Sequence, residues 1–184
     1  MQQMSIIVMK KMLTVPCILM CMLSFMSTDL PAQDNPLEVF SNLMDGIWQV
    51  EGTWDNGEYF KQEIQYEWGL DKKMIKVKTY GTVNKETSEW GLRNEGIRVW
   101  DLSSKSIKFW EFDVFGGITT GTCTANGNSF HYNYEYQGMN LRDSWNYIDS
   151  DNYEFIVSSV KNGNVDKVFQ KSSIKRITRN TSSE

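Results

Sequence analysis

Apolar and polar residues alternate through most of the chain after residue 45. The segment YFKQEIQYEW, 59–68, places Phe60, Ile64 and Tyr66 on one side, with charged and amide side chains between them. The segment FHYNYEYQ, 130–137, repeats the pattern with three tyrosines. A period of two over about eight residues predicts a half-buried antiparallel β-strand.

Turn signals separate these segments at short intervals. Asn-Gly pairs such as those at 126–127 and 162–163 supply the positive φ angles that tight hairpins need. No proline occurs from residue 37 onward, which suits uninterrupted hydrogen-bonded ladders. Between the turns we expect ten strands, at 47–54, 58–68, 73–83, 88–101, 106–114, 118–125, 128–136, 139–148, 152–160 and 165–178.

One segment, NPLEVFSNLM at 35–44, looks helical, because its apolar residues Leu37, Phe40, Leu43 and Met44 share one face. Ten strands joined by hairpins leave two unpaired edges unless the sheet closes. The pattern therefore predicts an all-β fold, an up-and-down antiparallel barrel of about ten strands with a short N-terminal helix. A two-sheet sandwich is the alternative. A barrel with this number of strands is expected to enclose a cavity.

The first 33 residues have the composition of a secretory signal. Lys10 and Lys11 precede an apolar run at 12–26, and a small residue, Ala32, stands near the end. The apolar run is shorter than a membrane span requires. We therefore expect residues 1–33 to be a signal peptide that directs export to the periplasm or the extracellular space.

Two alternatives to a cleaved leader remain open. One is an uncleaved anchor, and the other is a lipid attached at Cys17 or Cys21. Lipidation is less favoured, because Pro16 and Met20 stand where lipoprotein signals have a small side chain. Residues 34–184 are then one domain without a membrane span, long enough to bury about 70% of its unfolded surface.

Charge and cysteine content narrow the possible partners. Without Lys10, Lys11 and Asp29 the chain carries 17 basic and 22 acidic residues, a net charge of −5, which argues against nucleic acid or anionic lipid. Cys123 is the remaining cysteine and is expected to be a buried apolar residue. The single histidine, His131, is on the polar side of its strand, and no metal-ligand spacing occurs.

The stretch FWEFDVFGG, 109–117, contains two carboxylates, Glu111 and Asp113, on one side of a strand and about 6.6–6.8 Å apart. A simple hairpin places Arg98 opposite Phe109 and within ion-pair reach of Glu111. We expect these charges on the outer face, with the aromatic residues of the other parity facing inward. An acid–base pair of a hydrolase or isomerase, also using Asp143 with a tyrosine, is the alternative.

The segment Gly46-Ile47-Trp48 after a short helix resembles the opening of lipocalin-like (calycin) barrels. The segments GIRVWDLSSKSIKFWEFDVFGG, 96–117, and LRDSWNYIDSDNYEF, 141–155, are similar to hairpins of a bacterial family of such barrels, described mainly as domains of unknown function. The resemblance implies that Trp48 closes one end of a barrel and that Arg176 stacks on its ring, held together with Gly46 as a structural site. Nitrobindin-type barrels bind haem through a histidine near the chain end, and none follows residue 131 here, so no cofactor is expected.

The aromatic residues on the apolar parities are the candidate binding residues. They can line a lumen that takes a small hydrophobic or aromatic molecule. We therefore predict an exported lipocalin-like domain that binds a mostly apolar ligand without catalysis, the alternatives being the enzyme above and a filled barrel with a structural or envelope-interaction role. The candidate residues are Trp68, Trp110, Phe112, Tyr132, Tyr134, Trp145 and Tyr147.

Overall fold

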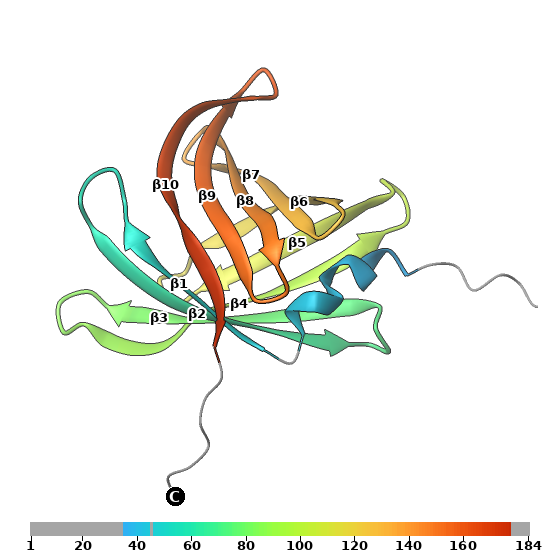
Figure 1. Ribbon diagram of the computed structural model, residues 1–184, viewed down its shortest axis with the longest axis horizontal. Helices are drawn as coiled ribbons and strands as arrows, with labels where there is room; N and C mark the ends of the chain where they lie inside the picture. Colours follow the sequence, from blue (N-terminus) through green and yellow to red (C-terminus); the bar gives the residue numbers. More distant parts are fainter. Residues whose placement is uncertain (1–34, 45, 178–184) are drawn as a thin grey trace, which may run out of the picture. The chain divides into compact units, whose positions relative to one another are not determined.

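A computed structural model describes residues 35–44 and 46–177, which form a 3₁₀ helix followed by a closed ten-stranded antiparallel barrel (Figure 1). Each strand pairs with the next one in the sequence, and β1 pairs with β10, so the barrel is up-and-down. The elements are η1 (Pro36–Leu43), β1 (Ile47–Thr53), β2 (Tyr59–Gly69), β3 (Met74–Asn84), β4 (Glu89–Asp101), β5 (Ser106–Asp113), β6 (Ile118–Asn126), β7 (Ser129–Tyr136), β8 (Met139–Asp149), β9 (Asn152–Lys161) and β10 (Asn164–Ile177).

The predicted barrel is thus confirmed, and the two-sheet sandwich is wrong. The ladder that closes it joins β1 to β10 through pairs such as Trp48 with Arg176 and Val50 with Ile174. Closure satisfies the N–H and C=O groups that would otherwise line two open edges.

Tight turns fix the register of the hairpins. Residues Gln137 and Gly138 have φ angles of 50° and 77°, and Asn162 and Gly163 have 52° and 81°. Two successive positive φ angles are the signature of a type I′ turn, whose twist matches that of the flanking strands. Glycine at the second position adopts this conformation without steric cost.

Irregularities in two ladders bend the longer hairpins. The register shifts twice between β3 and β4 and twice between β9 and β10, the latter near Lys167 and Gln170. Bulges of this kind increase local twist and bend a strand. The β9–β10 hairpin is accordingly a long curved arm (Figure 1).

The helix η1 covers one end of the barrel, here called the capped end. The Asn35 side chain accepts a hydrogen bond from the Leu37 N–H at 3.1 Å, which caps the helix, and Pro36 occupies the first turn. The apolar face predicted from the sequence is buried, and the Phe40 ring stacks on Phe130 with centroids 4.8 Å apart. The helix is of the 3₁₀ type, and its buried apolar side chains close this end of the barrel.

An aromatic core fills the part of the barrel next to η1. Trp48, Trp145 and Tyr153 are buried, and the Tyr153 ring meets the rings of both tryptophans at 5.3 and 5.8 Å. Edge-to-face contacts of this kind add about 0.5–1.5 kcal/mol each to the hydrophobic gain. The capped half of the barrel is therefore packed solid, and space for a ligand has to be sought toward the opposite end.

The predicted signal peptide, with Cys17 and Cys21, lies outside the described residues. Within 35–44 and 46–177, no helix has the length and the apolar character that crossing a bilayer requires.

Candidate functional site

Beyond the aromatic core, five inward-facing side chains form a polar layer toward the end opposite η1. We call Asn94, Arg98, Glu111, Tyr134 and Asp143 the interior polar cluster. Arg98 Nη2 donates to Glu111 Oε1 in a short ion pair, and Asn94 Nδ2 donates to Glu111 Oε2 at 2.9 Å. Both oxygens of this carboxylate are thus engaged.

Arg98 is the most deeply buried charge of the cluster, with 3% of its side chain exposed. Its guanidinium carbon lies 5.2 Å from the Phe109 ring and 5.0 Å from the Tyr132 ring, a cation–π arrangement. A buried cation of this kind is tolerated because a hydrogen-bonded carboxylate accompanies it. Gly96 leaves space for the two side chains of this ion pair, because a Cβ atom there would lie 2.8 Å from Glu111 Cγ and 3.0 Å from Arg98 Nη1.

Asp143 and Tyr134 form the second half of the cluster. The Tyr134 hydroxyl donates to Asp143 Oδ1 at 2.9 Å. Burial raises the pKa of Asp143 to about 7, against the effect of the Tyr134 hydrogen bond, and the Glu111 charge raises it further. Near neutral pH this carboxyl can therefore hold or release a proton.

The Tyr132 hydroxyl beside the cluster interacts with Arg98 and with the buried Tyr66. Four other buried polar atoms of the barrel have no hydrogen-bond partner among the described residues: Arg98 Nε in the cluster, and both side-chain polar atoms of Gln170 and Ser172 Oγ on β10. Buried polar groups are usually paired, so these atoms mark a place where a bound molecule or water can supply the partner. Glu111 keeps 28% of its side chain exposed, and Tyr134 and Asp143 are half-buried, so the layer is accessible.

The seven aromatic residues predicted from the sequence fall into four groups, the last being Trp110 and Phe112 on the outer face of β5. Tyr132 and Trp145 belong to the buried core, and Tyr134 joins the interior polar cluster. Trp68 and Tyr147 lie near the capped end, where Lys72 Nζ is 5.5 Å from the Trp68 ring and Tyr147 is 39% exposed.

The inward orientation expected for Trp110 and Phe112 is wrong. Ile107 and Phe109 are the buried residues of β5, with 5% and 3% exposure, while Phe112 is 50% exposed and Trp110 lies outside the core. Both parities of this strand carry apolar residues, so alternation alone does not decide which side is buried. The buried guanidinium of Arg98 pairs with Glu111 inside the barrel, and Trp110 and Phe112 consequently face outward.

The pairing expected around Glu111 is present, but on the inner face. Arg98 is opposite Phe109 in the β4–β5 ladder and binds Glu111. Asp113 does not join it, because its Oδ1 accepts hydrogen bonds from the backbone N–H groups of Phe115 and Gly117, both at 2.8 Å. The two carboxylates therefore have separate structural partners, which removes the geometric basis for an acid–base pair between them.

Trp48, Arg176 and Gly46 meet at the capped end. The guanidinium carbon of Arg176 lies 4.5 Å from the Trp48 ring centroid, as the resemblance implied. Arg176 also donates to the Met44 and Ser150 carbonyls at 3.3 and 3.2 Å. A Cβ atom on Gly46 would lie 2.8 Å from Arg176 Nη1, so the Gly-x-Trp spacing leaves space for the guanidinium.

His131 and Cys123 show no reactive setting. His131 Nδ1 lies 3.1 Å from Ser144 Oγ, and burial with the nearby Arg142 charge lowers its pKa. Cys123 is buried, as expected, and burial raises its pKa to about 12, so it remains a thiol. Among the described residues there is no group of three potential metal ligands.

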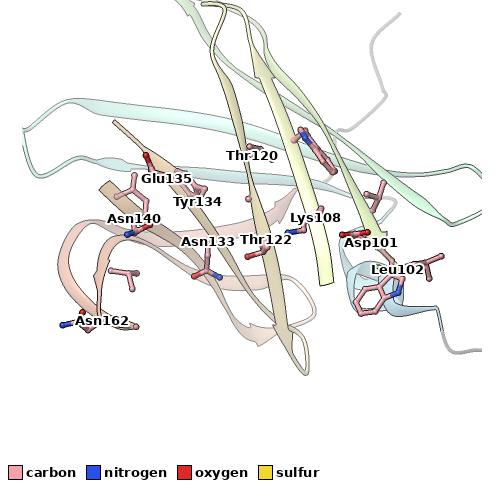
Figure 2. A pocket seen from close by; sticks show the side chains of 17 residues that line it. Asp101, Leu102, Lys108, Thr120, Thr122, Asn133, Tyr134, Glu135, Asn140 and Asn162 are labelled. Atoms are coloured by element: carbon pink, nitrogen blue, oxygen red, sulfur yellow. The ribbon is translucent and has the colours of Figure 1, made fainter. Parts of the chain in front are cut away.

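A second feature lies on the outer wall. A groove of about 1020 Å³ runs from Asp101 and Leu102, at the β4–β5 turn, to Asn162 at the β9–β10 turn (Figure 2). Its floor is the outer face of β5, β6 and β7 and includes Trp110, which is therefore not a residue of the lumen. Nothing in the alternation pattern indicated this groove, because it arises from the curvature of the closed sheet.

The fold and the site define a closed ten-stranded antiparallel barrel with a polar layer in its interior. No protein-family model matches the chain, and no curated protein matches it. A solved structure, described as that of a redesigned beta barrel, is similar to it with a TM-score of 0.42 and 14% sequence identity, covering 77% of this chain and 96% of that one. No function follows from a likeness at this level.

Proposed function

We propose that the chain is a lipocalin-like binding protein that holds a small amphipathic molecule in the barrel, without catalysis. The observation that supports this most is a buried polar atom without a partner, Arg98 Nε, in a cluster that also contains the half-buried Asp143. A ligand group with hydrogen-bonding capacity would satisfy atoms that the fold leaves unpaired.

The interior polar cluster changes the ligand expected from the sequence. A mostly apolar molecule would leave Arg98 Nε without a partner, at a cost of about 1–3 kcal/mol, and would leave the Tyr134 hydroxyl as the hydrogen-bond donor to a buried Asp143 carboxylate. The Phe109 and Phe155 rings still offer an apolar wall. The ligand class that fits both is an aromatic or aliphatic body with a polar head that donates a hydrogen bond.

Membership of the lipocalin-like family and export remain part of this proposal. The stacked Trp48–Arg176 pair and the close approach of Gly46 to it support membership of the family. The signal-like composition of residues 1–33 supports export. Mass spectrometry of the intact exported protein would test export, with a mature N-terminus near Asp34 as the expected result.

A proton-transfer enzyme is the second candidate, and one observation favours it. Asp143 has a pKa of about 7 because of its burial, and it is hydrogen-bonded to the Tyr134 hydroxyl, so the pair could donate or accept a proton at neutral pH. Turnover of a substrate that disappears in Asp143→Asn with unchanged stability would favour this reading over binding alone.

The binding test uses a neutral fluorescent amphiphile, N-phenyl-1-naphthylamine, whose single N–H can donate to Asp143. At pH 8 we expect saturable one-to-one binding that weakens about fivefold to tenfold in Asp143→Asn, because a charge-assisted hydrogen bond becomes a neutral one. Asp166→Asn, an exposed site on β10, is the matched control. Native mass spectrometry of the purified protein searches for a retained ligand. Absence of both probe binding and a retained molecule would favour the filled, structural barrel.

A further inference from the structure

The outer groove is a second site, on the other side of the barrel wall from Asp143, and it meets the interior polar cluster at Tyr134, which also lines the groove (Figure 2). The register of the ladders fixes which side chains share its floor: Lys108 is opposite Thr122 on β6, and Thr122 is opposite Asn133 on β7. Trp110 is opposite Thr120 one step along the same face. Figure 2 shows Lys108, Thr122 and Asn133 along this floor, between Leu102 at one end and Asn162 at the other.

The groove offers hydrogen-bonding groups that the protein itself does not use. Among the described residues, no hydrogen bond engages the side chains of Lys108, Thr122, Glu135 or Asn140. Each of these side chains lines the groove. Lys108 on β5 is opposite Thr122 on β6, and Glu135 on β7 is opposite Asn140 on β8, so these unused groups follow neighbouring strands with a step of about 4.8 Å, close to the length of one pyranose ring. Asn133 between them is already engaged, because its Oδ1 accepts from Arg142 Nε at 2.8 Å and its Nδ2 donates to the His131 carbonyl at 3.3 Å.

Trp110 adds an apolar surface to this polar row. It faces outward from β5, is half-buried, and has no ring partner among the described residues. An indole has a large flat apolar face and one N–H donor. A sugar ring has one face of C–H groups and an equatorial rim of hydroxyls, so it matches an aromatic plate surrounded by amides and hydroxyls.

The charges of the groove argue against a polyanionic ligand, and the closed sheet argues against an added peptide strand. Its acidic residues, Asp101 and Glu135, are set against one cation, Lys108, so a polyanion finds no basic track. The Asp101 carboxylate binds the hydroxyls of Ser103 and Ser104, which lower its pKa to about 2 and keep it ionised. A peptide cannot add as a further strand, because the barrel is closed.

We propose that this groove binds a neutral oligosaccharide, with Trp110 stacking on one ring while the unused side chains of the groove, Lys108, Thr122, Glu135 and Asn140, bind hydroxyls of its neighbours. The site does not include Asp143, the residue proposed to bind the ligand in the lumen. It uses the outer face of the same strands.

Calorimetric titration of the full protein with neutral hexasaccharides of glucose, mannose, xylose and N-acetylglucosamine tests the proposal. We expect one of these probes to bind, Trp110→Ala to weaken that binding by about tenfold, and Trp90→Ala to leave it within about twofold. Trp90 is a suitable control because it is an exposed tryptophan on β4, at 42%, that does not line the groove. Circular dichroism of both variants checks that they fold.

A second variant separates the groove from the lumen. Thr122→Val keeps the side-chain volume on the outer wall and removes a hydroxyl, so it should weaken the saccharide and leave N-phenyl-1-naphthylamine binding unchanged. Asp143→Asn should do the reverse. If none of the hexasaccharides binds, if binding ignores Trp110 and Thr122, or if an extended peptide or an anionic polysaccharide binds there instead, the proposal is wrong.

Discussion

Asp143 makes the stability of the barrel depend on pH in a direction that can be worked out. In the unfolded chain an aspartate has a pKa of about 3.9, and in the barrel burial raises it to about 7. Between these values the folded state binds more protons than the unfolded state, so the contribution of this group to stability falls as pH rises through this window. Above about pH 7 both states are ionised and the dependence on pH levels off.

The size of the effect follows from the same shift. A difference of about three pKa units corresponds to about 4 kcal/mol, at about 1.4 kcal/mol per unit. Because Asp143 is half-buried rather than sealed, solvent reduces this, and we expect about 2–3 kcal/mol. Asp143→Asn removes the titration and keeps an oxygen for the Tyr134 hydroxyl, so the variant should match or exceed the wild type in stability above pH 7.

Urea unfolding at pH 5, 6, 7 and 8 measures this difference. The comparison at equal pH cancels His131, whose lowered pKa acts in the opposite direction by destabilising the fold as pH falls. The exposed Asp166→Asn is the control for removing a carboxylate. The reasoning is refuted if the gap between wild type and Asp143→Asn stays constant from pH 5 to 8, or if the variant loses more stability at pH 8 than at pH 5.

Four further substitutions test the packing. Glu111→Gln leaves the buried Arg98 without its counter-charge and should cost about 3–5 kcal/mol in urea unfolding; a loss below about 1 kcal/mol would contradict a buried ion pair. Phe109→Ala should cost about 3–5 kcal/mol and Phe112→Ala less than about 1 kcal/mol, and the reverse order would show that β5 faces the other way. Gly46→Ala should cost about 1–2 kcal/mol by displacing the guanidinium above the indole, and an unchanged thermal midpoint would oppose that close contact.

The barrel could be predicted because its pattern is local. Alternation and Asn-Gly turns placed all ten strands to within one or two residues of their observed bounds. The contact between Arg176 and the Trp48 ring followed from the resemblance of Gly46-Ile47-Trp48 to known barrels, and the guanidinium does lie over the indole.

The site was less accessible from sequence, for physical reasons. In β5 both faces carry apolar residues, so the choice between Phe109 and Phe112 depended on where Glu111 would be stable. A carboxylate is stable inside a barrel only when a cation from another strand is buried next to it. The register places Arg98 near Glu111 but does not show that Arg98 is buried. Asp143 could have been placed in the lumen, since it shares the parity of Trp145.

The alternation of apolar and polar residues also could not predict the β-bulges or the curvature of the strands. Gln170 faces inward with Ile174, in the continuous part of the β9–β10 ladder, but Val168 of the same parity is 46% exposed, because the register shifts between Val168 and Gln170. The outer groove depends on the same curvature, since its residues come from strands and turns far apart in the sequence.

The claim that the interior polar cluster is a ligand site is tested most directly by titrating three proteins with N-phenyl-1-naphthylamine at pH 8. Wild type and Trp110→Ala should bind one molecule with equal affinity, and Asp143→Asn should bind it about fivefold to tenfold more weakly. Binding that ignores Asp143 and depends on Trp110, or no saturable binding to any of the three, would contradict it.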